Sequence, residues 1–161
     1  MRRSAFVIAV AMAALTVSVW ALFNRPDREP PWPDHIQGFS FSPFRADEDV
    51  IAHILPSDAE IDADLKLLAG KSDLVRSYSV EGTLGDIPRL AAPYGIKVML
   101  GGWVDNDREK TAAELARLID IARHNPDVKS VVVGNEVALR GDVPLQDLIG
   151  YLKQVKAAVK Q

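Results

Sequence analysis

Hydrophobic residues follow two different patterns along the chain. Residues 5–23 are apolar except for Thr16 and Ser18, whereas from residue 36 onwards short apolar runs alternate with segments whose apolar residues recur every three or four positions. Short apolar runs bounded by turn residues are typical of buried strands, and the longer spacing is typical of amphipathic helices. The sequence therefore predicts an apolar N-terminal helix followed by alternating strands and helices.

The predicted helices have recognisable ends. Ser57 and Glu60 have the spacing of a capping box, which opens a helix that Gly70 stops. Gly95 follows another helical segment, where a left-handed C-terminal cap is expected. The strands are expected over residues 36–41, 74–78, 96–103 and 128–134, and the helices over 57–69, 84–94, 111–124 and 145–159.

The resulting order, βαβαβαβα, predicts an α/β fold with a parallel sheet and right-handed crossovers. The architecture is then an open doubly wound sheet or a (β/α)8 TIM barrel. The glycine motifs of nucleotide-binding folds do not occur, and residues 39–44 (FSFSPF) occupy the place of the first one. Aromatic and polar residues instead gather at the carboxyl ends of the strands, where barrels carry their chemistry. We therefore expect half of a TIM barrel over residues 36–161.

The first 35 residues predict a membrane attachment. The apolar run has about the 20 residues that a bilayer-spanning helix needs. Arg2 and Arg3 precede it, which predicts an uncleaved signal anchor over residues 1–23 with the remaining chain outside the cytoplasm. A cleavable signal peptide is the alternative, although no small-residue cleavage site follows Phe23. Residues 24–35 contain four prolines and predict a stiff tether.

Composition excludes several classes of function. The net charge is −3 and the basic residues are scattered, so no nucleic-acid partner is expected. The chain has no cysteine, which excludes disulfides, thiolate metal sites and cysteine nucleophiles. Its three histidines do not have a metal-binding spacing. We expect neither a metal nor a cofactor.

Glu136 is the principal candidate for chemistry. It follows the apolar residues 131–133 and Gly134, where a buried strand would emerge. Burial and nearby carboxylates raise the pKa of such a group, a property that the general acid of glycosidic cleavage requires. Asn135 beside it is suited to bind a sugar hydroxyl. The alternative is an ordinary polar strand end that caps the next helix.

Four further residues are candidates for substrate binding. Phe41, Tyr78 and Trp103 have apolar faces that suit sugar stacking, or they pack the mouth of the barrel. Arg76 lies in the second strand, where an unpaired charge is costly, so it should pair with a carboxylate or a ligand. Solvated loop or surface positions are expected for Glu81, Asp105, His53 and His124.

Together these segments resemble the bacterial branch of glycoside hydrolase family 17, whose members are β-1,3-glucanases and β-glucan transglucosylases. The resemblance runs from about Gly38 to Val159, and its motifs are residues 38–44 (GFSFSPF), 62–65 (DADL), 75–79 (VRSYS), 95–98 (GIKV) and 133–137 (VGNEV). By this resemblance, Glu136 is the catalytic acid/base and Asn135 its partner at the sugar 2-hydroxyl. Arg76 and Tyr78 match the second-strand motif near the site, and Trp103 matches the end of the third strand.

The sequence departs from the family in its strand count. A whole barrel takes eight strands and about 250 residues. The family's nucleophile is a second Glu at the end of the seventh strand, whereas Glu81 and Asp105 follow the second and third strands. A retaining mechanism needs two carboxyl groups about 5 Å apart. The chain resembles an O-glycosyl hydrolase family but has no residue at the place of the second catalytic Glu. Whether it is an enzyme therefore stays open, and we expect little or no turnover from this chain alone.

Three hypotheses follow. The first is the N-terminal half of a β-1,3-glucan hydrolase or transglucosylase, anchored in the inner membrane, facing the periplasm and working with a separate second half where one exists. The second is a non-catalytic half-barrel that binds β-glucan. The third is a homodimer that closes one eight-stranded barrel, because the first and last strands leave open edges. Its symmetry places two Glu136 groups four strands apart, so we expect it not to reproduce the retaining geometry.

Overall fold

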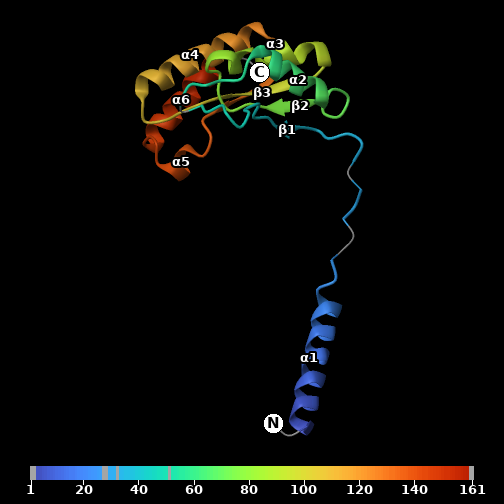
Figure 1. Ribbon diagram of the computed structural model, residues 1–161. Helices are drawn as coiled ribbons and strands as arrows, with labels where there is room; N and C mark the ends of the chain where they lie inside the picture. The colour runs from blue at the N-terminus through green and yellow to red at the C-terminus, as the bar shows by residue number, and fades with distance from the viewer. Residues whose placement is uncertain (1–2, 27–28, 32, 51, 160–161) are drawn as a thin grey trace. The chain divides into compact units, whose positions relative to one another are not determined.

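The chain consists of two units. The computed structural model describes residues 3–26, 29–31, 33–50 and 52–159, and it divides into Met1–Pro33 and Asp34–Gln161. The first unit contains helix α1 (Arg3–Phe23), which confirms the predicted apolar helix (Figure 1). Its 21 residues rise about 1.5 Å each, so it is about 30 Å long. Within the described residues, only this helix is long and apolar enough to cross a membrane. The tether prediction lies partly outside the described residues.

The second unit contains a parallel sheet, as the sequence predicted. Its strands are β1 (Phe39–Ser40), β2 (Leu74–Arg76), β3 (Lys97–Gly102) and β4 (Val128–Val133). Neighbours in the sheet follow chain order, β1-β2-β3-β4, and every pair is parallel. The first two strands are shorter than predicted. β1 pairs with β2 over only two residues, and β2 pairs with β3 over three.

Helices alternate with these strands. They are α2 (Asp58–Leu68), η1 (Gly82–Asp86), α3 (Ile87–Ala91), η2 (Ala92–Tyr94), α4 (Arg108–His124), α5 (Val137–Arg140) and α6 (Leu145–Ala158). The helix predicted over residues 84–94 is broken into η1, α3 and η2. Pro88 and Pro93 lie within it and cannot donate helical hydrogen bonds. The sequence analysis missed α5 entirely.

Side-chain and glycine caps fix the helix ends. The capping box is confirmed, since the Glu60 main-chain N–H donates to Ser57 Oγ at 3.4 Å and the Ser57 N–H donates to the Glu60 carboxylate at 2.8 Å. Gly95 adopts φ 70°, which confirms the left-handed cap. The start predicted for α4 was three residues late, because Asp107 caps it by accepting from two main-chain N–H groups at 3.0 Å. Local polar residues therefore delimit the helices.

Substitution of Ser57 by Ala is expected to lower the free energy of unfolding by about 1 kcal/mol, because it leaves a helix N–H without its acceptor. Hydrogen bonds from Ser57 also lower the pKa of Glu60 below its usual value. That contribution is complete at neutral pH and is lost as the pH falls through the lowered pKa. Urea denaturation at neutral and acid pH tests both statements. Ser57→Asp, which keeps an acceptor at the cap, should retain most of the stability.

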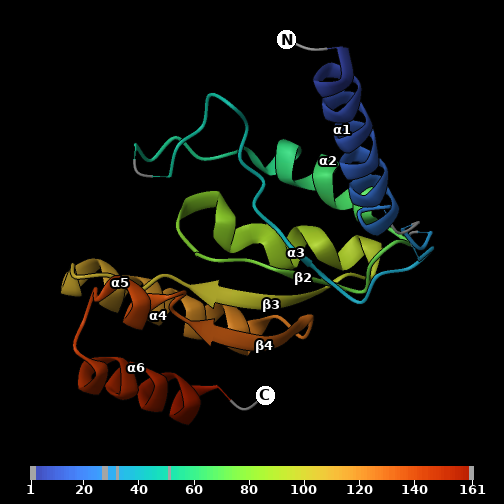
Figure 2. The same cartoon turned by 90° about the horizontal axis from the view of Figure 1, so that it is seen from below.

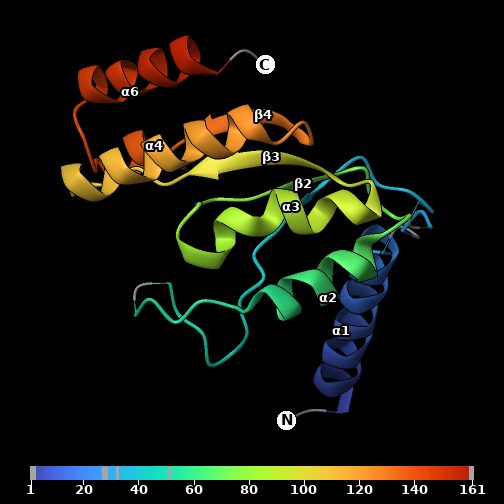
Figure 3. The ribbon, with the colours of Figure 1, turned by 90° about the horizontal axis from the view of Figure 1, so that it is seen from above.

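The core lies between the sheet and its helices. Figures 2 and 3 show α2, α3 and α4 along one face of the sheet. Val75, Val98 and Leu100 point to that face and are fully buried. Strand residues alternate between faces, so Arg76 and its register partner Met99 lie on the opposite face, where both are half-buried. The helix packing thus leaves Arg76 on the open side of the sheet.

β4 is less buried than the sequence predicted. Only Val128 of its six residues is buried, and residues 130–133 are half-buried. The reason is topological, because β4 is the last strand of the sheet and pairs on one side only. An apolar composition alone does not distinguish such an edge strand from a central one.

Candidate functional site

A sharp turn after β4 places Glu136. The strand ends at Val133, Gly134 adopts φ 76°, and Glu136 adopts φ 54°, ψ 21° at the start of α5. A side chain on Gly134 would lie 2.4 Å from the Val137 side chain, so glycine is required at that position. Glu136 is exposed, although the strand that it follows was expected to be buried. It lies on a turn past an edge strand, where few neighbours cover it.

Asn135 is held by two arginines. Arg76 Nη2 donates to the Asn135 side-chain oxygen at 2.8 Å, across 59 positions of sequence. Arg140 Nη1 donates to the Asn135 main-chain carbonyl at 2.5 Å. The protein partner of Arg76 is thus an amide rather than a carboxylate, and the expectation that Arg76 binds a ligand stays a prediction. Among the described side chains, Arg76 Nε is the buried polar atom that has no hydrogen-bond partner.

The same two arginines stack on aromatic rings. The Arg76 guanidinium lies 4.8 Å from the centre of the Tyr78 ring. The Arg140 guanidinium lies 4.5 Å from the centre of the Trp103 ring. Both distances fall within the range of cation–π attraction. These contacts link the ends of β2 and β3 to Asn135, so the structure brings together residues that the sequence analysis singled out separately.

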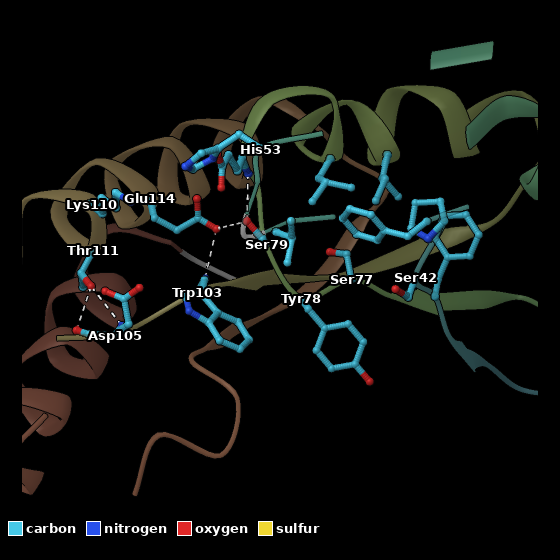
Figure 4. A pocket seen from close by; sticks show the side chains of 17 residues that line it. Ser42, His53, Ser77, Tyr78, Ser79, Trp103, Asp105, Lys110, Thr111 and Glu114 are labelled. Carbon is cyan, nitrogen blue, oxygen red and sulfur yellow. Dashed lines mark hydrogen bonds and ion pairs between the residues drawn. The ribbon is translucent and has the colours of Figure 1, made fainter. Parts of the chain in front are cut away.

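A pocket of 660 Å³ opens beside these strand ends (Figure 4). Phe41, Tyr78 and Trp103 all line it. Trp103 is 37% exposed, whereas Phe41 is buried with 8% of its surface accessible. The residues Arg76, Asn135 and Glu136 are not part of its lining. The predicted site residues therefore form two adjoining groups, an aromatic pocket and a polar strand end.

Glu114 on α4 organises the pocket, and the sequence analysis missed it. Its Oε1 accepts from the Ser79 hydroxyl at 2.7 Å, the Val80 N–H at 2.7 Å and the Trp103 N–H at 3.0 Å. Figure 4 shows the carboxylate between the loops that follow β2 and β3. A usable signal was present, because Glu114 lies at helical spacing from the buried residues Thr111 and Leu118. A carboxylate on the buried face of a helix indicates partners in the fold.

Three of the four loop and surface residues expected to be solvated lie around the pocket. Glu81 and Asp105 are half-buried and line it, and 40% of the Glu81 side chain stays exposed. Glu81 Oε1 lies 2.5 Å from His53 Nδ1, and exposed His53 also lines the pocket. His124 is on the surface beside Asp120, as expected. Within the described part of the chain, no group of three His, Asp or Glu side chains is arranged to hold a metal ion.

Known proteins match both the sequence and the fold. The family model of the BtgE/BtgC glycoside hydrolase domain matches residues 38–161. A glucan 1,3-beta-glucosidase of Schizosaccharomyces pombe is 30% identical over 104 residues, 62% of this chain and 32% of that protein. A putative glucan endo-1,3-beta-glucosidase btgC of Aspergillus niger is 28% identical over 131 residues, 74% of this chain and 19% of that protein. The chain thus spans less than a third of either relative's length.

The solved structures agree. An active-site mutant of the Rhizomucor miehei beta-1,3-glucanosyltransferase, in complex with laminaritriose, matches with a TM-score of 0.62 at 24% identity. The match covers 75% of this chain and 44% of that one. A second structure, described as a glycoside hydrolase family 17 enzyme of the same organism, matches with a TM-score of 0.61 at 24% identity, covering 74% of this chain and 44% of that one.

These matches define the class of the fold. The second unit is part of a (β/α)8 barrel like that of glycoside hydrolase family 17. The chain itself belongs to the BtgE/BtgC glycoside hydrolase family. The family and the half-barrel expected from the sequence are thereby confirmed. The relatives named here are fungal, so assignment to a bacterial branch stays a prediction.

Proposed function

We propose that this chain carries the acid/base half of a retaining site that hydrolyses or transfers β-1,3-linked glucan. The observation that carries the proposal is the strand-end arrangement. Asn135 and Glu136 follow β4, Arg76 binds the Asn135 side chain, and Tyr78 and Trp103 line the adjoining pocket. The family match and the β-1,3-glucan activities in the names of its relatives support the substrate class.

In this proposal each residue has a separate role. Glu136 donates a proton to the glycosidic oxygen and later removes one from the incoming water or sugar hydroxyl. Asn135, oriented by Arg76, hydrogen-bonds the 2-hydroxyl of the reacting glucosyl unit. The rings of Phe41, Tyr78 and Trp103 offer apolar faces to neighbouring sugars. The nucleophile is a second carboxylate from outside the four described strands, as the family pattern implies.

The N-terminal helix supports a second part of the proposal. α1 anchors the chain in a membrane, and the barrel portion acts outside the cytoplasm. Inner-membrane attachment with a periplasmic domain is the arrangement that Arg2 and Arg3, the basic residues before the apolar run, favour. Retention in the membrane pellet after a carbonate wash, together with protease access from the periplasmic side only, would support it. A cleaved, soluble product would contradict it.

Substitution of Trp103 by Ala is expected to weaken binding of laminari-oligosaccharides about tenfold, an effect of about 1.4 kcal/mol from losing one stacking ring. Calorimetric titration of the full chain in detergent micelles measures the affinity. Trp20→Ala in α1 is the matched control, since it removes the same side chain from the other unit, and it should bind like the unmodified chain. Failure of the unmodified chain to bind laminari-oligosaccharides would contradict the proposed substrate.

A non-catalytic glucan-binding role is the second candidate. It is favoured by the separation of the aromatic pocket, which the described residues form, from the exposed Glu136. Reducing-end assays with laminarin separate the two functions. Turnover that disappears in Glu136→Gln supports the enzyme, whereas binding without turnover in the unmodified chain supports the binding role. Because β1 and β4 are edge strands, the assays are run beside sedimentation analysis, which detects a homodimer or an added second half.

A further inference from the structure

Arg140, at the end of α5, is a residue that the sequence analysis did not select. We propose that Arg140 is a positioning residue that fixes the Asn135–Glu136 turn against the end of β3. The inference rests on the proposed function, because it assigns Arg140 a part in presenting the acid/base. The contacts that support it do not depend on that function.

The first group of contacts binds the turn itself. Arg140 Nη1 donates to the Asn135 carbonyl at 2.5 Å, and the Arg140 main-chain N–H donates to the Glu136 carbonyl at 2.9 Å. One residue therefore holds two consecutive carbonyl groups. Hydrogen bonds from a charged donor are stronger than neutral ones, so the guanidinium contact is a substantial restraint on the peptide that precedes Glu136.

The second group of contacts joins Arg140 to β3. Its guanidinium stacks on the Trp103 ring at 4.5 Å, and Nη2 lies 3.5 Å from the Val104 carbonyl. Both residues directly follow β3. The planar guanidinium can stack and donate at the same time, which a lysine ammonium cannot do. Arg140 thus fastens the turn after β4 to the segment after β3.

Glu136 needs such a restraint because of its backbone. A residue other than glycine is disfavoured in the left-handed region, and Glu136 adopts φ 54° there. Conformations of this kind persist only where their surroundings impose them. Arg76 binds only the side chain of Asn135, whereas the Arg140 guanidinium binds the Asn135 carbonyl and the Arg140 main-chain N–H binds the Glu136 carbonyl, which are the carbonyls of the two peptides that flank the Glu136 Cα. Arg140 is therefore the residue placed to hold the unfavourable conformation.

A simpler role for Arg140 is an ion pair within its own loop. Asp142 accepts from Arg140 Nε at 2.8 Å and lies 2.5 Å from Nη2. If that pair were the purpose of Arg140, removing Asp142 would have the same consequences as removing Arg140. In the positioning role, Asp142 only orients the guanidinium, and its loss leaves the contacts to Asn135 and Trp103 in place.

Nuclear magnetic resonance of the full chain in detergent micelles separates the two roles. The Cα and Cβ shifts of Glu136 report its backbone conformation, and the Trp103 indole N–H, assigned as the signal lost in Trp103→Phe, reports the stacked guanidinium. In Arg140→Gln we expect the Glu136 shifts to move away from left-handed values and the indole signal to shift. In Asp142→Asn and in Arg108→Gln, a matched loss of an arginine from another ion pair, both signals should stay in place.

Unchanged Glu136 and Trp103 signals in Arg140→Gln would overturn the proposal, as would equal changes in Asp142→Asn. If Arg140→Gln does not fold, Arg140→Lys decides, because it keeps the charge and loses the stack. In Arg140→Lys the indole signal of Trp103 should shift, and the Glu136 shifts should lie between those of the unmodified chain and those of a residue outside the left-handed region. An unchanged spectrum would count against the proposal.

A ligand measurement connects the inference to the proposed function. Arg140→Gln should weaken laminaritriose binding roughly threefold, the size of a surface cation–π contact, because it releases Trp103. Asp142→Asn should bind like the unmodified chain. Equal affinity in Arg140→Gln and the unmodified chain would contradict a role in the binding site. If the unmodified chain does not bind laminaritriose, the proposed function fails, while the Glu136 and Trp103 signals still decide the positioning role.

Discussion

Substitution of Gly101 by Ala is expected to lower the free energy of unfolding by about 3 kcal/mol, an effect at the upper end for overpacking. A Cβ at this position would lie 2.3 Å from the Ser77 carbonyl oxygen and 2.8 Å from the Tyr78 Cα. Both are main-chain atoms, so the clash is relieved only by separating β3 from the segment that follows β2. Urea denaturation followed by circular dichroism measures the loss.

Gly150→Ala is the matched control for this substitution. Gly150 lies inside α6, and a Cβ there would meet no atom within 4 Å. Replacing a helical glycine by alanine is expected to raise stability by up to about 1 kcal/mol. The two glycine substitutions should therefore have opposite signs. Equal stability of the two variants would show that the ends of β2 and β3 do not approach as closely as described.

Substitution of Glu114 by Ala is expected to have the second large effect, a loss of about 3 kcal/mol in the free energy of unfolding. Three donors share Oε1, two of them in the buried residues Ser79 and Val80 and one in the exposed Trp103. Each donor that loses a charged acceptor costs about 1 kcal/mol or more. Ser79 and Trp103 also lose their common anchor. We therefore expect weaker laminari-oligosaccharide binding as well, measured by the same titration as for Trp103.

Two further variants define what Glu114 contributes. Glu114→Gln keeps one carbonyl oxygen that accepts hydrogen bonds, so its loss should be about 1 kcal/mol, the difference between a charged and a neutral acceptor. Glu109→Ala removes a carboxylate from the first turn of the same helix, where it should cost less than about 1 kcal/mol. If Glu114→Ala is no more destabilising than Glu109→Ala, the three hydrogen bonds do not stabilise the fold.

Much of the fold could be predicted from local patterns. The alternation of apolar runs and helical spacings predicted the parallel sheet, and the apolar run before residue 24 predicted α1. The aromatic and polar residues at the strand ends favoured a barrel, and with it the observed strand order. Ser57 and Gly95 identified helix ends correctly, because capping depends on residues within a few positions. The helix over residues 84–94 was overestimated, since its two prolines permit short helical turns but not one continuous helix.

The candidate site depended on contacts that no local pattern contains. Arg76 meets Asn135 across 59 residues because β2 and β4 flank β3 in the sheet. Glu114 and Arg140 were not selected, because the residues that they contact, such as Trp103, lie on other elements of the fold. The exposure of Glu136 follows from the position of β4 at the sheet edge.

The sequence by itself thus determined the elements, their order and the residue types at the strand ends, because periodicity and capping are local properties of the chain. Only the tertiary structure decided which of those residues meet. Sheet register and helix packing bring distant side chains within hydrogen-bonding distance, and they left Glu136 exposed on a turn beside an aromatic pocket.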